Sequence, residues 1–174
     1  MEVTDQLSRV DRYQLIPRTL IFLVWTDYVL LIKGSSNKRL WPNLYNGLGG
    51  HVEQGEDILG SARRELYEES GLLTDHLRLV GVITVNTGES PGIVIFVLRG
   101  DLPDQATVRP DRRIQTAEGT LVWVSRSDLA AIPLVDDLNI LLPKVLGIKP
   151  ADAPFSARYT HDNQGHMQFL YDAL

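Results

Sequence analysis

The stretch from Gly50 to Leu72, GHVEQGEDILGSARRELYEESGL, carries acidic side chains at a spacing that could do chemistry. Apolar residues at helical spacing and a glycine after Ser70 predict a helix over 57–70. At about 100° per residue, three of its acids fall on one edge of the helix: Glu65, Glu68 and Glu69. The neighbouring edge is apolar and is expected to be buried: Ile58, Leu59, Ala62 and Leu66.

Clustered acids of this kind need a counter-charge. Like charges three and four residues apart repel one another, and partial burial raises the cost of ionising them. Magnesium takes carboxylate, phosphate and water oxygens, and this helix edge offers carboxylates without Cys or His. The stretch therefore indicates a Mg²⁺ site, with Mn²⁺ as a possible substitute. For an isolated motif the alternative is a solvated face rich in Arg and Glu.

The complete spacing of this stretch is Gly50-x5-Glu56-x7-Arg64-Glu65-Leu66-x-Glu68-Glu69-x-Gly71-Leu72. It matches the signature of the Nudix hydrolases, and on these residues the chain is identified as a member of that family. The resemblance implies an α+β fold, an α/β/α sandwich around a mixed sheet, as a single domain over residues 1–174. It also implies Mg²⁺-dependent hydrolysis of a nucleoside diphosphate linked to another group.

The resemblance also assigns roles to residues. It implies that Glu65, Glu68 and Glu69 are the metal-binding and catalytic acids, with Glu65 either a ligand or the general base. Glu56 and Arg64 are expected to hold the helix and its loop in position.

Two further metal ligands are expected from outside the helix. The resemblance places a backbone carbonyl that binds metal at Gly49. Family members often add an acid from a later loop. Glu118, in a Glu-Gly-x-x-x-Trp context, is the first candidate, and Glu89 is the second. The alternative for each is an exposed loop glutamate.

The substrate is indicated by motifs outside the signature stretch from Gly50 to Leu72. Asn46-Gly47-Leu48-Gly49-Gly50 and Pro133-Leu134-Val135-Asp136-Asp137 are similar to the mutator-type nucleoside triphosphate pyrophosphohydrolases. This implies cleavage of a triphosphate, with an ordinary or oxidised base, to the monophosphate and pyrophosphate. The chain has Leu134 and Val135 where some oxidised-purine enzymes have a stacking tryptophan.

Candidate substrate-binding residues follow from these motifs. Residues that could contact the base are Asp136, Asp137 and Asn139, and Asn46 is a further candidate for substrate binding. The alternative for the two aspartates is charge that complements a helix dipole. Basic residues that could lie along the phosphates are Lys33, Lys38 and Arg39. Trp41 and Tyr45 could stack on a base, or pack beside the sheet. His51 is expected to be an ordinary exposed or packing residue.

Proteins with other functions carry the same signature as the stretch from Gly50 to Leu72. ADP-ribose, nucleotide sugars and dinucleoside polyphosphates are alternative substrates. A non-catalytic nucleotide-sensing module is an alternative of another class. Such modules usually lack some acids of the signature, and none is missing here.

Composition limits the remaining possibilities. The net charge of −5 argues against a surface that coats nucleic acid polymers. The chain has no cysteine, which excludes disulfides, thiolate catalysis and zinc–thiolate sites. No apolar run is long enough for a membrane span, and Glu2 and Asp5 stand where a signal peptide would be basic and then apolar. We therefore expect a cytoplasmic protein with a small nucleotide as its partner.

The remaining elements are read from hydrophobic pattern and turn residues. Residues 1–17 are expected to form an arm that leads into the sheet. Strands are expected at 19–25, 28–32, 46–52, 77–85, 93–98 and 121–124. A small helical turn is expected at 128–131 and a second helix at 135–145, in which Pro143 is awkward. The extension 149–174 is compatible with a hairpin of 155–160 and 166–171. It must pack on the domain or on a second subunit, so a homodimer is possible.

Overall fold

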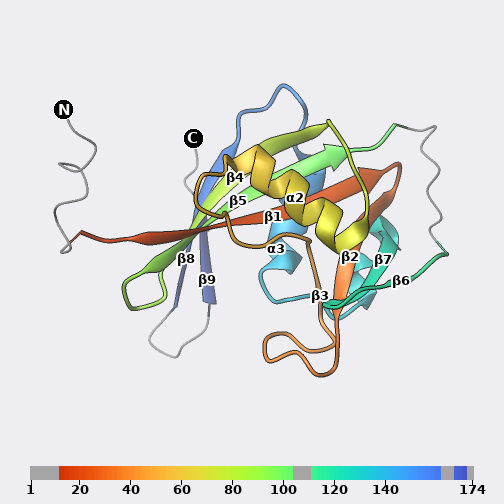
Figure 1. The fold of residues 1–174 in the computed structure, drawn as a ribbon, viewed down its shortest axis with the longest axis horizontal. Helices are drawn as coiled ribbons and strands as arrows, with labels where there is room; N and C mark the ends of the chain where they lie inside the picture. The colour runs from red at the N-terminus through yellow and green to blue at the C-terminus, as the bar shows by residue number, and fades with distance from the viewer. Residues whose placement is uncertain (1–11, 104–110, 162–166, 172–174) are drawn as a thin grey trace.

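The computed structural model describes residues 12–103, 111–161 and 167–171. In that part of the chain, nine strands form one mixed sheet (Figure 1). The strands are β1 Leu15–Trp25, β2 Tyr28–Gly34, β3 Tyr45–Asn46, β4 Leu77–Val85, β5 Gly92–Asp101, β6 Ile114–Gln115, β7 Gly119–Ser125, β8 Phe155–His161 and β9 Met167–Tyr171. The helices are α2 Ile58–Ser70, the 3-10 helix η1 Arg126–Ala131 and α3 Leu138–Gly147.

The strands follow the order β6-β7-β2-β1-β5-β4-β8-β9, with β3 beside β2. Two pairs are parallel, β1 with β5 and β4 with β8, and the other pairs are antiparallel. β1 and β2, which contain the expected strands 19–25 and 28–32, form an antiparallel hairpin with Leu23 opposite Leu30. The predicted mixed sheet is therefore confirmed.

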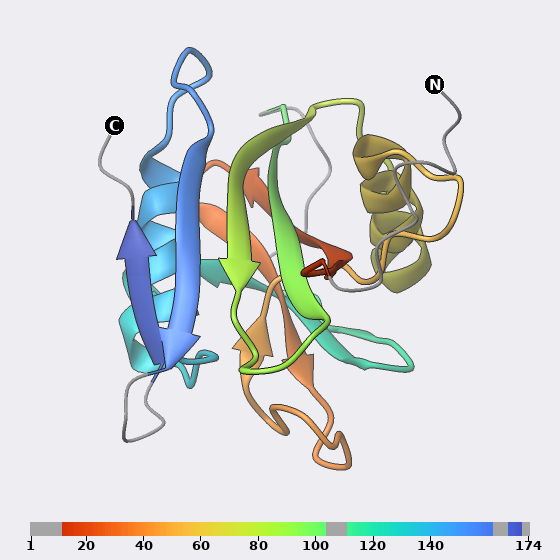
Figure 2. The same cartoon turned by 90° about the vertical axis from the view of Figure 1, so that its left-hand side faces the viewer.

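Both faces of the central strands are buried. Phe22, Val29 and Leu31 belong to one hydrophobic core, which also contains α3. Ile21 and Leu30, their neighbours in sequence, belong to a second core that contains α2. Side chains alternate between the faces of a strand, so one sheet supplies both cores. Figure 2 shows α2 and α3 on opposite sides of the strands, which is the three-layer arrangement expected from the sequence.

Helix α2 has sequence-encoded ends. The Asp57 carboxylate accepts a hydrogen bond from the Gly60 N–H at 2.9 Å and so caps the first turn. Gly71 stops the helix in the left-handed conformation, with its N–H bonded to the Tyr67 carbonyl. Ala62 and Leu66 are buried as expected, but Leu59 is 36% exposed. The predicted apolar edge is therefore narrower than the sequence pattern, and Leu59 was wrongly included in it.

Several element boundaries differ from the sequence-based expectation. β1 begins at Leu15, inside the expected arm, because residues 15–17 already pair with β5. The stretch 46–52 is not one strand: after β3 only isolated bridges remain, because Gly49 has φ +126°. α3 begins at Leu138 rather than at Val135, whose N–H bonds to the Tyr45 carbonyl. β6 lies between the predicted strands 93–98 and 121–124, where the sequence analysis predicted no strand.

The C-terminal part completes one edge of the sheet. α3 buries four residues, Leu138, Leu141, Leu142 and Val145, and continues through Pro143. β8 and β9 form the expected antiparallel hairpin, and β8 pairs with β4 of the same chain. The hairpin is thus supported within the domain, and a homodimer stays a prediction.

Some expectations lie outside the described residues: those for 1–11 of the arm and for 162–166 of the hairpin. Within the described residues, neither the length nor the hydropathy of any helix reaches what a bilayer crossing requires.

Candidate active site

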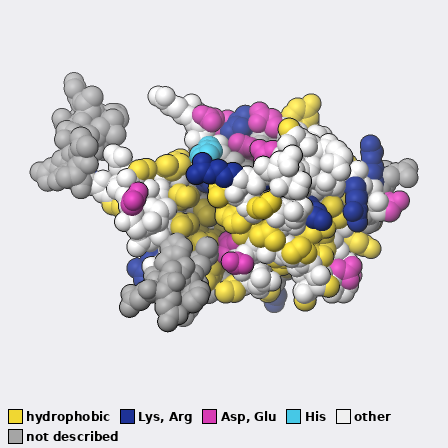
Figure 3. Space-filling model, turned by 90° about the horizontal axis from the view of Figure 1, so that it is seen from below, with side chains coloured by type: hydrophobic (Ala, Val, Ile, Leu, Met, Phe, Trp, Pro, Cys, Tyr) yellow, Lys and Arg dark blue, Asp and Glu magenta, His cyan; other side chains and the backbone are white. Residues whose placement is uncertain are grey.

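A cleft of about 770 Å³ lies beside helix α2 and is bordered by the loop 35–44. Its floor includes the stretch that runs from β3 to α2, and its far end reaches the start of α3 and strand β8. Its main polar lining residues are Arg18, Lys38, Asn46, Glu69, Glu118 and Asp137. Figure 3 shows acidic, basic and histidine side chains gathered along one border of a hydrophobic surface.

Arg64 organises the acids of α2. Its guanidinium forms a two-pronged pair with Glu56, with N–O distances of 2.7 and 2.9 Å. Nη1 also donates to Glu65 at 2.9 Å and to Glu68 at 3.2 Å, and Nη2 donates to the His51 carbonyl at 3.1 Å. One side chain therefore connects the loop before α2 to two of the three candidate catalytic acids.

This network favours charged side chains. The hydrogen bonds from Arg64, together with the Glu53 N–H, lower the pKa of Glu56 to about 2. Hydrogen bonds to Glu56 and Glu65 in turn raise the pKa of Arg64 above its usual value. The positioning role of Glu56 and Arg64 stays a prediction, and these hydrogen bonds are the contacts through which it would act.

Glu65 and Glu69 lie against the glycines that precede the helix. A Cβ atom on Gly50 would come within 2.5 Å of Glu65 Oε1. Gly49 has no room for a side chain either, since its Cβ would meet the Thr19 carbonyl oxygen at 2.4 Å. The Gly49 N–H donates to Glu69 Oε2 at 2.8 Å. Close approach of backbone and carboxylates is thus the physical reason for the Gly-Gly pair.

The Glu69 carboxyl is short of positive charge. Burial raises its pKa to about 7, the Gly49 hydrogen bond opposes the rise, and the nearby Glu118 and Glu65 add to it. A carboxyl whose pKa is displaced by burial and like charge in a cleft is typical of functional sites.

The donor atoms at this edge of α2 fit Mg²⁺. Among the described residues, no three His, Cys, Asp or Glu side chains are close enough to form a metal cage by themselves. Mg²⁺ does not require such a cage, because it keeps several waters and uses one or two carboxylates plus substrate phosphates. Glu69 offers a carboxylate in the cleft. A cation bound beside it would lower the pKa that burial has raised.

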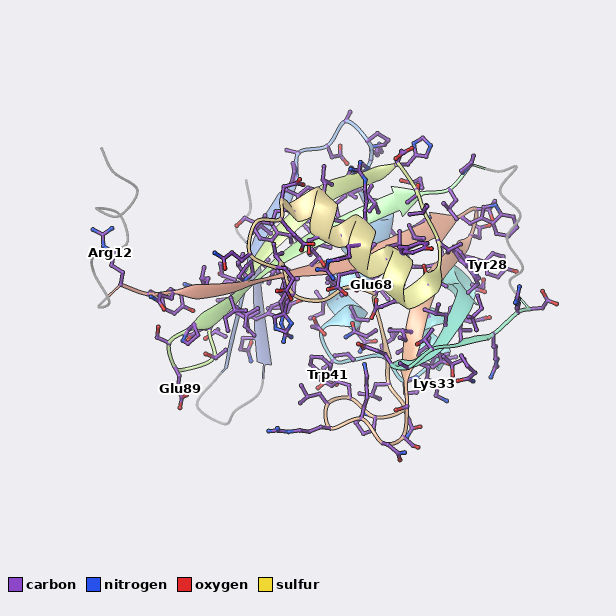
Figure 4. The ribbon with its side chains drawn as sticks, in the orientation of Figure 1. Arg12, Tyr28, Lys33, Trp41, Glu68 and Glu89 are labelled. Atoms are coloured by element: carbon purple, nitrogen blue, oxygen red, sulfur yellow. The ribbon has the colours of Figure 1, made fainter. Side chains whose placement is uncertain are left out.

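The two loop acids differ in position. Glu118 lines the cleft and receives a 2.7 Å hydrogen bond from Lys38. Glu89 is exposed in the turn between β4 and β5, away from α2 (Figure 4). The geometry therefore favours Glu118 over Glu89 as the additional acid.

Asp137 lies at the other end of the cleft. It directly precedes α3 but makes no side-chain capping hydrogen bond in the geometry of that helix, and the backbone of Leu138 has only a small effect on its pKa. The Tyr159 hydroxyl of β8 donates to its Oδ2 at 3.0 Å instead. Burial raises the pKa of Asp137, and the Tyr159 hydrogen bond opposes this effect. These contacts favour a role in the cleft over a purely helix-capping role.

The raised pKa of Asp137 leads to a stability prediction. An acid whose pKa is higher in the folded state stabilises most below its unfolded pKa, and this contribution is lost as the pH rises through the folded value. Asp137→Asn keeps an acceptor for Tyr159 and should raise Tm at pH 7 by about 2–4 °C. The gain should shrink toward pH 4 in thermal melts. The matched control is Asp136→Asn, at an exposed position, and an equal gain there would contradict the prediction.

Other expected residues are divided between the cleft and the surface. Asn46 and Arg39 line the cleft, and Asn46 Oδ1 accepts from the Gly47 N–H. Lys33 does not line it, since its Nζ lies over the Tyr45 ring at 5.7 Å. Asp136 is exposed and is not part of the lining. The expected roles of Lys33 and Asp136 in substrate binding therefore have no support from the geometry.

Sequence reasoning missed three cleft residues: Arg18, His51 and Tyr159. Arg18 donates to His51 Nε2 from Nε at 3.2 Å and from Nη2 at 2.9 Å. The two residues lie opposite each other in an isolated antiparallel bridge between β1 and the stretch before α2. No short-range pattern links such distant positions. Arg18 stands one residue before the predicted strand 19–25, so the sequence pattern did not mark it as part of the sheet.

The chain is similar to several known proteins. The family model described as NUDIX domain matches residues 15–169. An oxidized purine nucleoside triphosphate hydrolase of Danio rerio is 39% identical over 84 residues, 48% of this chain and 53% of that protein. The m7GpppN-mRNA hydrolase NUDT17 of the same organism is 32% identical over 148 residues, 76% of this chain and 47% of that protein. The chain spans about half the length of the curated relatives it matches.

Solved structures share the fold. The mutator MutT protein of Bacillus halodurans superposes with a TM-score of 0.71 at 20% identity, over 91% of this chain and 98% of that chain. The NUDIX domain of Shewanella oneidensis NrtR, solved with ADP ribose, gives 0.62 at 18% identity, over 84% and 97%. With its sheet between two helices and a family match that covers most of its length, the chain belongs to the NUDIX domain family.

Proposed function

We propose that the protein hydrolyses a diphosphate linkage of a nucleoside triphosphate, with an ordinary or oxidised base, to the monophosphate and pyrophosphate in a Mg²⁺-dependent reaction. The observation that carries the proposal is the cleft, which has Glu69 of α2 at one end and Asp137 at the other. A relative named oxidized purine nucleoside triphosphate hydrolase supports the substrate class.

The residues have distinct roles in this proposal. Bound Mg²⁺ would neutralise phosphate charge and polarise the bond to be cleaved. Its ligands would be Glu68, Glu69 and the Gly49 carbonyl, with Glu118 as an additional acid. Glu65 is either a further ligand or the base that takes a proton from the attacking water. Arg64 and Glu56 hold these acids in place.

The nucleoside would lie in the other half of the cleft. Asn46 and Asp137 offer amide and carboxylate groups that suit hydrogen bonds to a base, and Arg39 offers a charge to the phosphates. Asp137 is held by Tyr159, so its orientation is fixed before substrate binds.

Trp41 is the candidate that stacks on the base. It lies in the loop after β2 (Figure 4), lines the cleft, is 45% exposed and has φ +54°. An exposed aromatic side chain on unfavourable backbone suggests a functional constraint. Stacking on one base contributes about 1–3 kcal/mol, so Trp41→Ala should raise KM about tenfold or more. Trp41→Phe should retain most of the affinity. Equal KM values for wild type and Trp41→Ala would contradict this role.

A dinucleoside polyphosphate, including an mRNA cap, is the second candidate substrate. The alignment with the m7GpppN-mRNA hydrolase NUDT17 extends over 148 residues, more than that with the triphosphate hydrolase. The same acids could cleave either linkage, because both are phosphoanhydrides.

A substrate panel tests the proposal. It contains triphosphates with ordinary and oxidised purines, ADP-ribose, a nucleotide sugar, a dinucleoside polyphosphate and a capped oligonucleotide, each with Mg²⁺ and with EDTA. We expect the highest kcat/KM on a triphosphate, release of pyrophosphate and loss of turnover in EDTA. A preference for the capped substrate would support the second candidate. No turnover on any compound would favour a non-catalytic nucleotide sensor.

A further inference from the structure

Lys38 and Glu118 form an ion pair on the border of the cleft. The Lys38 Nζ lies 2.7 Å from Glu118 Oε2, and both residues line the cleft. The two side chains are 34% and 55% exposed. Among the described residues, Glu118 has no second ion-pair partner. The acid that is the candidate additional metal ligand therefore already carries a counter-ion from the chain itself.

Backbone contacts bring the pair together. The Ser35 N–H donates to the Glu118 carbonyl at 3.4 Å, and the Lys38 N–H donates to the Ser35 carbonyl at 3.1 Å. The stem of Lys38 passes over Gly34, where an added Cβ would lie 3.6 Å from the lysine Cδ. Gly34 is in turn paired with Gly119, the residue after Glu118. The local fold thus directs the ammonium group to Glu118.

The charges of this pair also act on Glu69. Burial is the main cause of the raised pKa of Glu69, Glu118 adds to the rise, and Lys38 opposes it. The pair is therefore close enough to Glu69 for one cation to interact with both acids. In the described part of the chain, however, no three His, Cys, Asp or Glu side chains converge on one point. Glu118 faces Lys38 instead of completing a cluster with the acids of α2.

We propose that Lys38 is an internal counter-ion of Glu118, which a divalent cation must displace before Glu118 can act as a ligand. This inference rests on the proposed function, in which Glu118 is the additional acid of the metal site. An ammonium group and a divalent cation on the same carboxylate repel each other, so they compete for it. Partly exposed ion pairs are weak, so a divalent cation can displace Lys38. Lys38 therefore lowers the affinity of the free protein for the metal by a modest factor.

Binding of Mn²⁺ in the absence of nucleotide tests the inference. Lys38→Met keeps the stem over Gly34 and removes the charge, so it should raise the Mn²⁺ affinity about two- to fivefold. Electron paramagnetic resonance of free Mn²⁺ during a titration measures the affinity. The matched control is Arg39→Met, which removes the next cation of the cleft lining and should change the affinity less. No increase in Lys38→Met, or an equal increase in both variants, would overturn the inference.

A double-mutant cycle shows whether Lys38 acts through Glu118. Glu118→Gln alone should lower the Mn²⁺ affinity, because it removes a charged ligand. Adding Lys38→Met to Glu118→Gln should then leave the affinity unchanged. The same gain in both backgrounds would indicate a general charge effect and overturn the inference, as would an unchanged affinity in Glu118→Gln.

The cycle also separates this inference from the proposed function, since no substrate is present. Coupling between Lys38 and Glu118 in a protein that hydrolyses no nucleotide would support the counter-ion and reject the proposed reaction. Hydrolysis by a protein without this coupling would do the reverse. Thermal melts confirm that each variant is folded.

Discussion

Replacing Glu69 with glutamine is expected to lower kcat by about 10²- to 10³-fold on whichever substrate the wild type hydrolyses. Stabilisation of transition-state charge by a metal is worth several kcal/mol, and about 1.4 kcal/mol corresponds to one factor of ten. The amide keeps an oxygen acceptor for the Gly49 N–H, so the fold should persist. Steady-state kinetics at saturating Mg²⁺ measure the effect.

Stability should change in the opposite direction. The pKa of Glu69 is raised from 4.5 to about 7, so its contribution to stability is present below pH 4.5 and is lost as the pH rises through 7. Glu69→Gln should therefore have a higher Tm than wild type at pH 8 in EDTA, with a smaller difference at pH 5. Less activity together with more stability marks a residue kept for function.

The control for Glu69 is Glu89→Gln. Glu89 is also a glutamate and was the second candidate for the additional loop acid. It is exposed in the turn between β4 and β5. Its replacement should leave kcat and Tm unchanged. Full activity in Glu69→Gln would remove Glu69 from the site, and a large loss in Glu89→Gln would favour Glu89 as the additional acid.

Structure that depends on residues close together in the chain was predictable from the sequence. The Asp57 cap, the Gly71 stop and the acids between them are set by residues close together in the chain, and the structure confirms the helix they predict. The alternation of apolar residues identified most strands for the same reason. Errors occurred where distant contacts decide the conformation. Val135 was assigned to a helix, but its N–H bonds to the Tyr45 carbonyl and the helix begins only at Leu138.

The site residues that the sequence did not predict also depend on contacts between distant parts of the chain. Arg18 and His51 are brought together by a bridge between β1 and the stretch before α2, and Tyr159 reaches Asp137 only because β8 joins the sheet beside β4. Conversely, Lys33 has a suitable charge but projects over Tyr45. Residue type therefore gives candidates, and the register of the sheet selects among them.

Arg64 is the residue whose loss should disturb the site most without removing an acid. Arg64→Met should lower kcat/KM about 10- to 100-fold, as removal of a group that orients catalytic ligands typically does. Glu65 and Glu68 would then repel each other and lose their common partner. Arg64→Lys keeps the positive charge but loses the two-pronged guanidinium, so its kcat/KM should lie between those of wild type and Arg64→Met. Arg63→Met, on the exposed side of the same helix, controls for loss of positive charge.

The pH dependence of stability distinguishes positioning by Arg64 from a general charge effect. Because Arg64 lowers the pKa of Glu56 from 4.5 to about 2, its contribution is complete above pH 4.5 and is lost as the pH falls toward 2. The difference in Tm between wild type and Arg64→Met should be constant from pH 8 to 5 and narrow below pH 4.5. A difference that does not depend on pH would mean that Arg64 stabilises α2 by packing alone. Any loss of activity in Arg64→Met would then need another explanation than the release of Glu56 and its neighbouring acids.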